Sequence, residues 1–499
     1  MSCLEEVMSV ERRPVGLMII LGITSMMMTI VCIVLVAQDA QPSQMQYGVV
    51  IDAGSTHTAL FVYHWPGGKE NGTGTVSQRS RCPTFVPGIS TFASNPEGAA
   101  KAMRPCLVWA LTEVPRGSRT SCPLYLGATA GMRLLNAKNI SSAKKVMEAV
   151  QVMLSSFPFD FRGAKVITGS DEGAFGWITL NYLLERLIWF DWSGQWVHDG
   201  STNTVGSMDL GGASTQLVFV SNTNSFKNSS DFLSFRLYGQ NYNVYTHSYQ
   251  CYGLNESLRM HLASLWKGAA SEVENPCFLL DYRINLTSDF IFGSPCTSFN
   301  GTGLMPGVGE TKVFVGSGDS VKCRHSIEAL FNFSSCGLKA NCSFNGVFQP
   351  NLQGHFTAFS GYYYTMKNLN LTDEFGSSSL HEFNATLGSF CSLTWVQVDP
   401  DMMNLCFSGN YIYTLLIRGY KFDEKSWRSI KFSNKVGSTE LGWSLGYMLN
   451  LTNLLPPESL SSASLTTMLA LLVTVFLVCA AIVAASLLLL SRASQYESV

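Results

Sequence analysis

Two similar hairpins constrain the fold of this chain more than any other feature. Residues 50–62 (VIDAGSTHTALFV) and, 157 residues later, residues 207–220 (SMDLGGASTQLVFV) each read as an apolar strand, a turn rich in Gly, Ser and Thr, and a second β-rich strand. In each hairpin the first strand leads an aspartate, Asp52 or Asp209, into the turn. The repeat predicts two related lobes, each built around one hairpin.

Turns of this composition suit phosphate. Glycines allow close approach and positive φ, and successive N–H groups with Ser and Thr hydroxyls form a concavity for phosphate oxygens. Two facing turns would hold a polyphosphate, with Asp52 and Asp209 binding a divalent cation through water between them. Each Asp-x-Gly alone is equally typical of an ordinary Asx-turn. The repetition favours the functional interpretation.

A small-residue segment lies between the hairpins. Residues 126–133 (LGATAGMR) follow a short apolar strand and precede an expected helix over residues 143–154. Thr129 and Arg133 would meet phosphate there or orient a neighbouring side chain. Simple strand-to-helix packing explains the small residues equally well.

An acidic segment follows. Residues 168–178 (TGSDEGAFGWI) come after an apolar strand over residues 164–167 and place Asp171 and Glu172 at the start of a helix that continues to residue 187. Acids at a helix N-terminus often only complement the helix dipole. A catalytic role requires that one of them reach a water positioned for attack.

Two apolar runs flank this region. The chain is 46% hydrophobic and 14% charged, and residues 15–37 and 465–490 contain no charge. As helices, about 34 Å and more, both exceed the ~30 Å of a bilayer core. Arginines lie beyond the outer ends, at Arg13 and Arg492, so both termini are predicted to be cytoplasmic and residues 38–464 to face outward. A cleaved signal peptide or a lipid-anchor signal are the alternatives.

Sequons and cysteines agree with an outward location. Eleven of the 14 cysteines lie between the two runs, which is compatible with a disulfide framework that leaves one over; Cys122 is the candidate because it precedes a probable buried strand. The net charge of −2, without long single-sign runs, argues against nucleic-acid binding. The N-x-Ser/Thr sequons are at Asn71, Asn139, Asn228, Asn255, Asn285, Asn300, Asn332, Asn341, Asn370, Asn384 and Asn450.

Five ordered segments resemble a known family. DAGSTHT (52–58), GATAGMR (127–133), SDEGAFGW (170–177), DLGGASTQ (209–216) and WSLGYMLNLTN (443–453) look like the five apyrase signature regions. Nearly the whole chain is similar to the cell-surface ecto-nucleoside triphosphate diphosphohydrolases of the GDA1/CD39 family, with a lean towards the subtype-eight or subtype-two branch.

The resemblance implies an α/β fold of two ribonuclease H-like lobes, of the actin, Hsp70 and sugar-kinase type, with a cleft between them. Lobe I would comprise residues 38–168 and 434–464, and lobe II residues 169–433. Transmembrane helices over residues 15–37 and 465–490 would leave residues 1–14 and 491–499 in the cytoplasm. The chain would be a multi-pass plasma-membrane protein with an extracellular catalytic domain.

The resemblance also implies Ca²⁺- or Mg²⁺-dependent hydrolysis of extracellular ATP, ADP, UTP and UDP. Glu172 matches the base that activates water, aided by Ser214 and Gln216, and Asp52 and Asp209 match the aspartates that hold the metal through water. We expect Glu172→Gln to lower turnover by about 10²- to 10⁴-fold. The positions implied to bind phosphate are Gly54, Ser55, Thr56, His57, Thr129, Gly211, Gly212, Ala213 and Ser214.

The family pattern also implies a disulfide set and a nucleobase site. Leu254 stands where relatives tend to carry a basic residue, so base binding would rest on stacking. Tyr364 of the segment 361–364 (GYYY) is the best match, and the alternative is that these tyrosines belong to the core. The implied disulfides are Cys82–Cys106, Cys251–Cys296, Cys277–Cys323, Cys336–Cys342 and Cys391–Cys406, which leave Cys122 free.

Two other classes of protein remain open. A non-catalytic surface receptor would share the apolar runs, sequons and cysteines but would not need paired Asp-Gly turns with Glu172. A phosphotransferase would share the turns, although an exported domain has little access to a cytosolic acceptor. Small residues in both runs also permit helix packing and a homo-oligomer in the membrane.

Overall fold

The computed structural model describes residues 45–190, 196–197, 203–221, 231–266, 270–297, 307–337, 341–372 and 378–455, with isolated positions near both ends. The two predicted spans, residues 15–37 and 465–490, lie outside these ranges apart from such positions. Within the described ranges, none of the helices combines the length and the apolar character that crossing a bilayer requires. Residues 45–65 and 69–455 belong to one compact unit.

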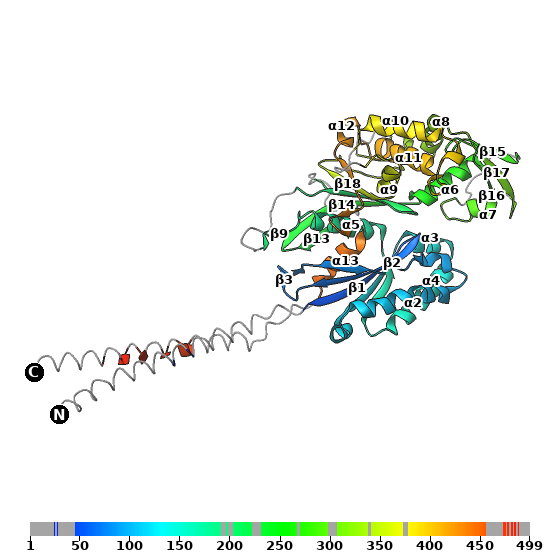
Figure 1. Cartoon of the computed structure of the whole chain (residues 1–499). Coiled ribbons are helices and arrows are strands. Elements are labelled where there is room, and N and C mark those ends of the chain that lie inside the picture. Colours follow the sequence, from blue (N-terminus) through cyan, green and yellow to red (C-terminus); the bar gives the residue numbers. More distant parts are fainter. Residues whose placement is uncertain are drawn as a thin grey trace, which may run out of the picture. The chain divides into compact units, whose positions relative to one another are not determined.

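The first hairpin forms the centre of one sheet (Figure 1). β1 is antiparallel to β2 and parallel to β7, and β7 is parallel to β8, which gives the order β5-β2-β1-β7-β8. Asp52 lies opposite Ala59 at the turn end of the hairpin. The strands are β1 (Gln46–Ala53), β2 (His57–Trp65), β5 (Ser77–Arg81), β7 (Pro123–Ala128) and β8 (Asp160–Val166).

The second hairpin forms a sheet of the same design. β11 is antiparallel to β12 and parallel to β18, and the order β14-β12-β11-β18-β19 repeats that of the first sheet, with β13 added at one edge. The predicted mixed α/β fold is confirmed. The strands are β11 (Gly206–Leu210), β12 (Ser214–Val220), β13 (Phe232–Leu237), β14 (Gln240–Gln250), β18 (Phe356–Ser360) and β19 (Ile430–Phe432).

Successive side chains of β1 point to opposite faces of the sheet and pack into two different hydrophobic cores. Val49 and Ile51 pack with helices α2 (Pro96–Glu113) and α4 (Ile140–Ser155), whereas Val50 packs on the opposite face. On that opposite face lies the layer formed by α5 (Gly169–Leu183) and α13 (Trp443–Thr452), whose side chains also pack against the second sheet.

The layer of α5 and α13 therefore joins the two sheets, and Figure 1 shows both helices between them. The helices approach closely at Gly446, where an added Cβ would lie 2.0 Å from the Phe175 carbonyl oxygen. Because both sheets share this layer, the lobe boundaries at residues 168/169 and 433/434 stay predictions.

Other elements cover the remaining faces. A three-stranded sheet of β15 (Glu272–Asn275), β17 (Thr311–Gly316) and β16 (Arg283–Thr287) stands apart from the two main sheets. The outer face of the second sheet packs with helices that include α9 (Gly361–Asn368) and α11 (Leu405–Tyr413).

Two predicted boundaries are wrong. The helix that opens with the acidic segment ends at Leu183 rather than at residue 187. The segment after β7 begins a helix of its own, α3 (Ala130–Lys138), before α4 starts. Small residues such as Gly131 weaken the helical pattern there. The structure contains all five disulfides that the family resemblance implies, and Cys122 is buried outside them.

Candidate active site

A cavity of about 330 Å³ opens where both hairpins turn. β1 and β11 end at it, and the candidate residues line it with the exception of Arg133, Asp171 and Gln216. Its wall is made by the turns (Asp52, Gly54, Ser55, Thr56, His57, Asp209, Gly211, Gly212, Ala213 and Ser214), with Thr129, Ala130 and Glu172 beside them and Arg81, Leu254, Asn255, Tyr364, Asn434, Glu440 and Trp443 further out.

The two turns face each other in contact. A Cβ added at Gly212 would lie 2.8 Å from Thr56 Cγ2 and 3.0 Å from Ser55 Oγ, so any other residue at this position would have to displace side chains of the opposite turn. Within the described chain, the N–H groups of Ser55, Thr56, Gly212 and Ala213 donate no hydrogen bond. Free N–H groups in two facing turns suit an oxyanion between them.

Each turn rests on glycine from a neighbouring segment. A Cβ added at Gly131 would lie 2.8 Å from Ser55 Cα, and one added at Gly253 would lie 2.3 Å from the Ala213 nitrogen. The carbonyl oxygens of the second turn accept hydrogen bonds from the start of α6 (Leu254–Leu265), whose Leu254 N–H bonds Gly211 at 2.9 Å. These contacts fix the turns from behind.

The two turn aspartates are electrostatically unusual. Burial, with help from Glu172, raises the pKa of Asp52 to about 8 and that of Asp209 to about 7; Ser360 opposes the rise at Asp209. One oxygen of each, Oδ1, is buried without a hydrogen-bond partner. The Trp443 indole N–H also lacks a partner of good geometry, yet it lies close enough to Asp52 to oppose the rise in pKa.

Two unpaired carboxylate oxygens with raised pKa values fit a bound cation, because a positive charge between them would remove the cost of ionising both. Among the residues that the structure describes, no group of three or more His, Cys, Asp or Glu side chains comes together at metal-binding spacing. Two carboxylates alone fit a hard cation that keeps most of its water ligands.

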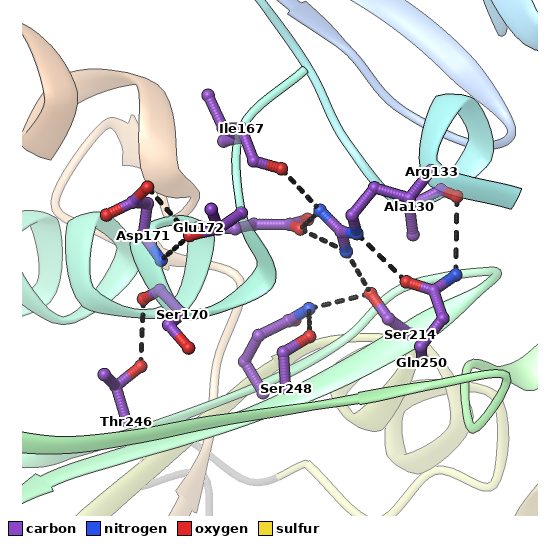
Figure 2. A network of polar contacts seen from close by, with 12 residues as sticks. Ala130, Arg133, Ile167, Ser170, Asp171, Glu172, Ser214, Thr246, Ser248 and Gln250 are labelled. Atoms are coloured by element: carbon purple, nitrogen blue, oxygen red, sulfur yellow. Dashed lines mark hydrogen bonds and ion pairs between the residues drawn. The ribbon is translucent and has the colours of Figure 1, made fainter. Parts of the chain in front are cut away.

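Glu172 lies at the start of α5 in an ion pair with Arg133 of α3 (Figure 2). Its Oε2 accepts hydrogen bonds from Arg133 Nη1 at 2.9 Å and Nη2 at 3.0 Å. Arg133 also donates to the Ile167 carbonyl, Gln250 and Ser214. Burial raises the pKa of Glu172, and Arg133 opposes that rise. Of the two roles predicted for Arg133, orienting a neighbour matches these contacts.

Ser214 is held from behind by two donors. Its Oγ accepts hydrogen bonds from Gln216 Nε2 at 2.7 Å and Arg133 Nη2 at 3.2 Å. Gln216 is buried and also donates to Ser248, so it does not line the cavity and acts through Ser214. Because both lone pairs of the Ser214 hydroxyl are used, its own proton is available to a group in the cavity.

The remaining candidate residues differ in how deeply their side chains are buried. Thr129 is buried at the start of α3, and His57 is exposed beside Thr56, 3.1 Å from its hydroxyl. Tyr364 is 52% exposed and its hydroxyl accepts a hydrogen bond from Asn434, whereas Tyr362 is fully buried. The alternative that these tyrosines belong to the core holds for Tyr362 but not for Tyr364.

Sequence reasoning missed part of the outer wall. Arg81 and Glu440 form an ion pair at 3.0 Å and both line the cavity. No motif marks either residue, because each lies on a short, polar strand whose sequence pattern gives no hint of a site. Trp443 was contained in the last signature segment but had no assigned role.

Fold and site together define a mixed α/β protein with two sheets of the same design and paired glycine turns at a polar cavity, an arrangement suited to a phosphorylated ligand. Residues 38–463 match the model of the GDA1/CD39 (nucleoside phosphatase) family, and the chain belongs to this family. It is accordingly an enzyme, a hydrolase of the phosphoanhydride class.

Relatives extend over most of the chain. It is 45% identical to ectonucleoside triphosphate diphosphohydrolase 8 of Gallus gallus over 446 residues, 87% of this chain and 89% of the relative. It is 41% identical to ectonucleoside triphosphate diphosphohydrolase 3 of Homo sapiens over 465 residues, 89% and 85% of the two chains. A crystal structure of nucleoside triphosphate hydrolases from Neospora caninum is similar in fold, with a TM-score of 0.61 at 16% identity, over 84% of this chain and 95% of that one.

Proposed function

We propose that this chain hydrolyses extracellular nucleoside triphosphates and diphosphates to the monophosphate and phosphate, in a reaction that depends on Ca²⁺ or Mg²⁺. One observation carries the proposal: two turns with free N–H groups face each other across a cavity, and the Glu172 carboxylate lies in its wall. The printed names of the relatives, which are ectonucleoside triphosphate diphosphohydrolases, agree with this substrate class.

Glu172 is the proposed general base. Both hydrogen bonds from Arg133 end on Oε2, so Oε1 is left without a partner in the described chain and can accept a proton from water. Burial raises the pKa of the carboxylate, which makes it a better proton acceptor, while Arg133 keeps it ionised. The opposition of these two effects suits a base that works near neutral pH.

Ser214 is the proposed water-orienting residue. A water that donates a hydrogen bond to Glu172 and accepts one from the Ser214 hydroxyl keeps one lone pair for in-line attack on the terminal phosphorus, and its proton passes to Glu172. Gln216 and Arg133 fix the Ser214 oxygen in this role. The free N–H groups of the two turns would stabilise the equatorial oxygens of the loose transition state. No covalent phosphoenzyme is required.

Asp52 and Asp209 would hold the divalent cation through its water ligands, and the cation would supply positive charge to the phosphate chain. Tyr364, exposed at the outer wall, would stack on the nucleobase. Stacking does not discriminate between bases, so purine and pyrimidine nucleotides, including ATP, ADP, UTP and UDP, are all proposed substrates.

The proposed location is the plasma membrane, with residues 15–37 and 465–490 as spans, the catalytic region outside, and homo-oligomers formed through the spans. Phosphate release from ATP by intact cells tests both function and location. We expect release that EDTA abolishes and Ca²⁺ restores, and that Glu172→Gln lowers sharply at matched surface delivery. An inactive wild-type chain at the surface would favour the non-catalytic receptor instead.

A further inference from the structure

Arg81 stands out in the charge distribution of the cavity. It is the only lysine or arginine among the described residues that line the cavity, whereas four acids line it: Asp52, Glu172, Asp209 and Glu440. Arg133 pairs with Glu172 from outside the lining, and a cation would offset the two aspartates. The remaining acid, Glu440, is paired with Arg81 itself.

The guanidinium of Arg81 is positioned by two contacts but has unpaired hydrogen-bond donors within the described chain. Its Nη1 donates to Glu440 at 3.0 Å, and its centre lies 5.8 Å from the Phe61 ring, which also lines the cavity. The other guanidinium nitrogens donate no hydrogen bond within the described chain. The side chain is 38% exposed. A positive group held against a cavity wall, with free donors, is suited to bind an anion.

The neighbours of Arg81 place it between the two ends of the site. Burial raises the pKa of Tyr364, Glu440 raises it further, and Arg81 opposes the rise. Arg81 also lies opposite Phe61 in β2, the strand that leaves the first turn. Arg81 therefore lies within electrostatic reach of the proposed base-stacking tyrosine and on the strand paired with the one that leaves the metal-holding turn.

We propose that Arg81 binds the phosphoryl group next to the nucleoside, and that Glu440 restrains Arg81 through their ion pair and so weakens substrate binding. The inference rests on the proposed function of the cavity. Arg81 would supply the positively charged side chain for the substrate that Leu254 cannot supply. Arg81 lies on β5 of the first sheet, whereas Leu254 lies at the start of α6.

The two partners should respond in opposite directions. Arg81→Gln removes one charged hydrogen bond to the substrate, so we expect KM for ATP and ADP to rise about tenfold. Glu440→Gln releases Arg81 and removes a negative charge from the cavity, so we expect KM to fall about threefold. Neither residue contacts the reacting atoms, so kcat should stay within about twofold of the wild-type value. Arg81→Lys keeps the charge and should give an intermediate KM.

Steady-state phosphate release by the full chain in cell membranes tests these expectations. The matched control is Arg79→Gln, because Arg79 lies on the same strand, pairs with Glu113 and does not line the cavity. Surface delivery of each variant is measured in parallel. Since Arg81 and Glu440 are both 38% exposed, neither substitution opens the core.

Three results would overturn the inference: a KM for Arg81→Gln within twofold of the Arg79→Gln control, a loss in kcat with unchanged KM, or a rise in KM for Glu440→Gln equal to that for Arg81→Gln. The last would mean that the ion pair only holds the hairpin of Glu440 in place. Failure of the proposed function is distinct, because the wild-type chain would then release no phosphate at all.

Discussion

Arg133→Gln tests the electrostatic design of the site most directly. The guanidinium donates five hydrogen bonds, two of them to Glu172, and the side chains of the pair are only 18% and 10% exposed. Removing one partner of such a pair costs about 3–5 kcal/mol because the other charge stays buried. We take the lower figure, because glutamine can replace part of the hydrogen bonding.

The direction in which the activity of Arg133→Gln changes with pH follows from the pKa of Glu172. Burial raises the pKa of Glu172 and Arg133 opposes it, so the variant carboxylate has a higher pKa still. The base is then more often protonated, and a rise in pKa worth about 3 kcal/mol lowers kcat/KM by at most roughly 10²-fold. Raising the pH restores the ionised base, so the activity gap between variant and wild type should narrow from about pH 6 to about pH 9.

The difference in stability between variant and wild type should change with pH in the opposite direction to the difference in activity. A carboxylate whose pKa is raised in the folded state stabilises the fold below its unfolded pKa, and this contribution is lost as the pH rises through the folded pKa. Because the rise is larger in Arg133→Gln, the stability gap to wild type should widen with pH while the activity gap narrows. Phosphate release and thermal inactivation, measured on the same membranes across the pH range, follow both gaps.

Arg104→Gln on α2 is the control, because Arg104 is exposed, stacks over Phe157 and lies away from the cavity. Arg133→Lys keeps the charge and should retain the wild-type pH profile at lower activity. An Arg133→Gln variant that loses the same factor at every pH would refute the account, since its defect would then be independent of the charge on Glu172. Activity within threefold of wild type at neutral pH would refute it equally.

Three further predictions follow from the cavity. Glu172→Gln should lower kcat by about 10²- to 10⁴-fold in phosphate-release assays with little change in nucleotide affinity, and an equal loss at a residue outside the cavity would argue against a base. Gly212→Ala should lower kcat/KM at least tenfold without loss of surface delivery, because the new Cβ would lie 2.8 Å from Thr56 Cγ2; wild-type kinetics would show that the turns can separate freely. Asp52→Asn and Asp209→Asn should each raise the Ca²⁺ concentration needed for half-maximal activity, and an unchanged Ca²⁺ titration would remove both from the metal site.

The pair of hairpins could be predicted because its signal is local. An apolar strand, a glycine turn and a second strand are contiguous in sequence, and the same pattern occurs twice. The strand order of the two sheets and the contact between Gly212 and the opposite turn then follow from the fold. The C-terminal end of α5 and the whole of α3 were not predicted. Small residues such as Gly131 give α3 little helical periodicity, and α5 ends before Glu185, whose φ of 57° no sequence pattern indicates.

The outer wall could not be predicted for a different reason. Arg81 and Glu440 are 359 residues apart and meet only because β5 and the β21 hairpin (Thr439–Glu440) lie at the same cavity. An arginine on an exposed strand is common and carries no chemical signal of its own. Whether such an arginine has a functional role depends on the other charged residues that line the cavity, and these can be identified only in the folded chain.

The position of Arg133 explains how Glu172 can stay ionised in a cavity that is rich in negative charge. A base beside two further carboxylates and a polyanionic substrate is pushed towards its protonated form, and burial adds to this effect. A lysine or arginine inside the cavity next to Glu172 would relieve the problem but would occupy the position of the attacking water. Arg133 avoids this conflict because it reaches Glu172 from α3, outside the cavity lining, and uses its remaining donors on Ser214 and Gln250. The charge that keeps the base ionised therefore also fixes the residue that orients the water, and one substitution should impair both functions.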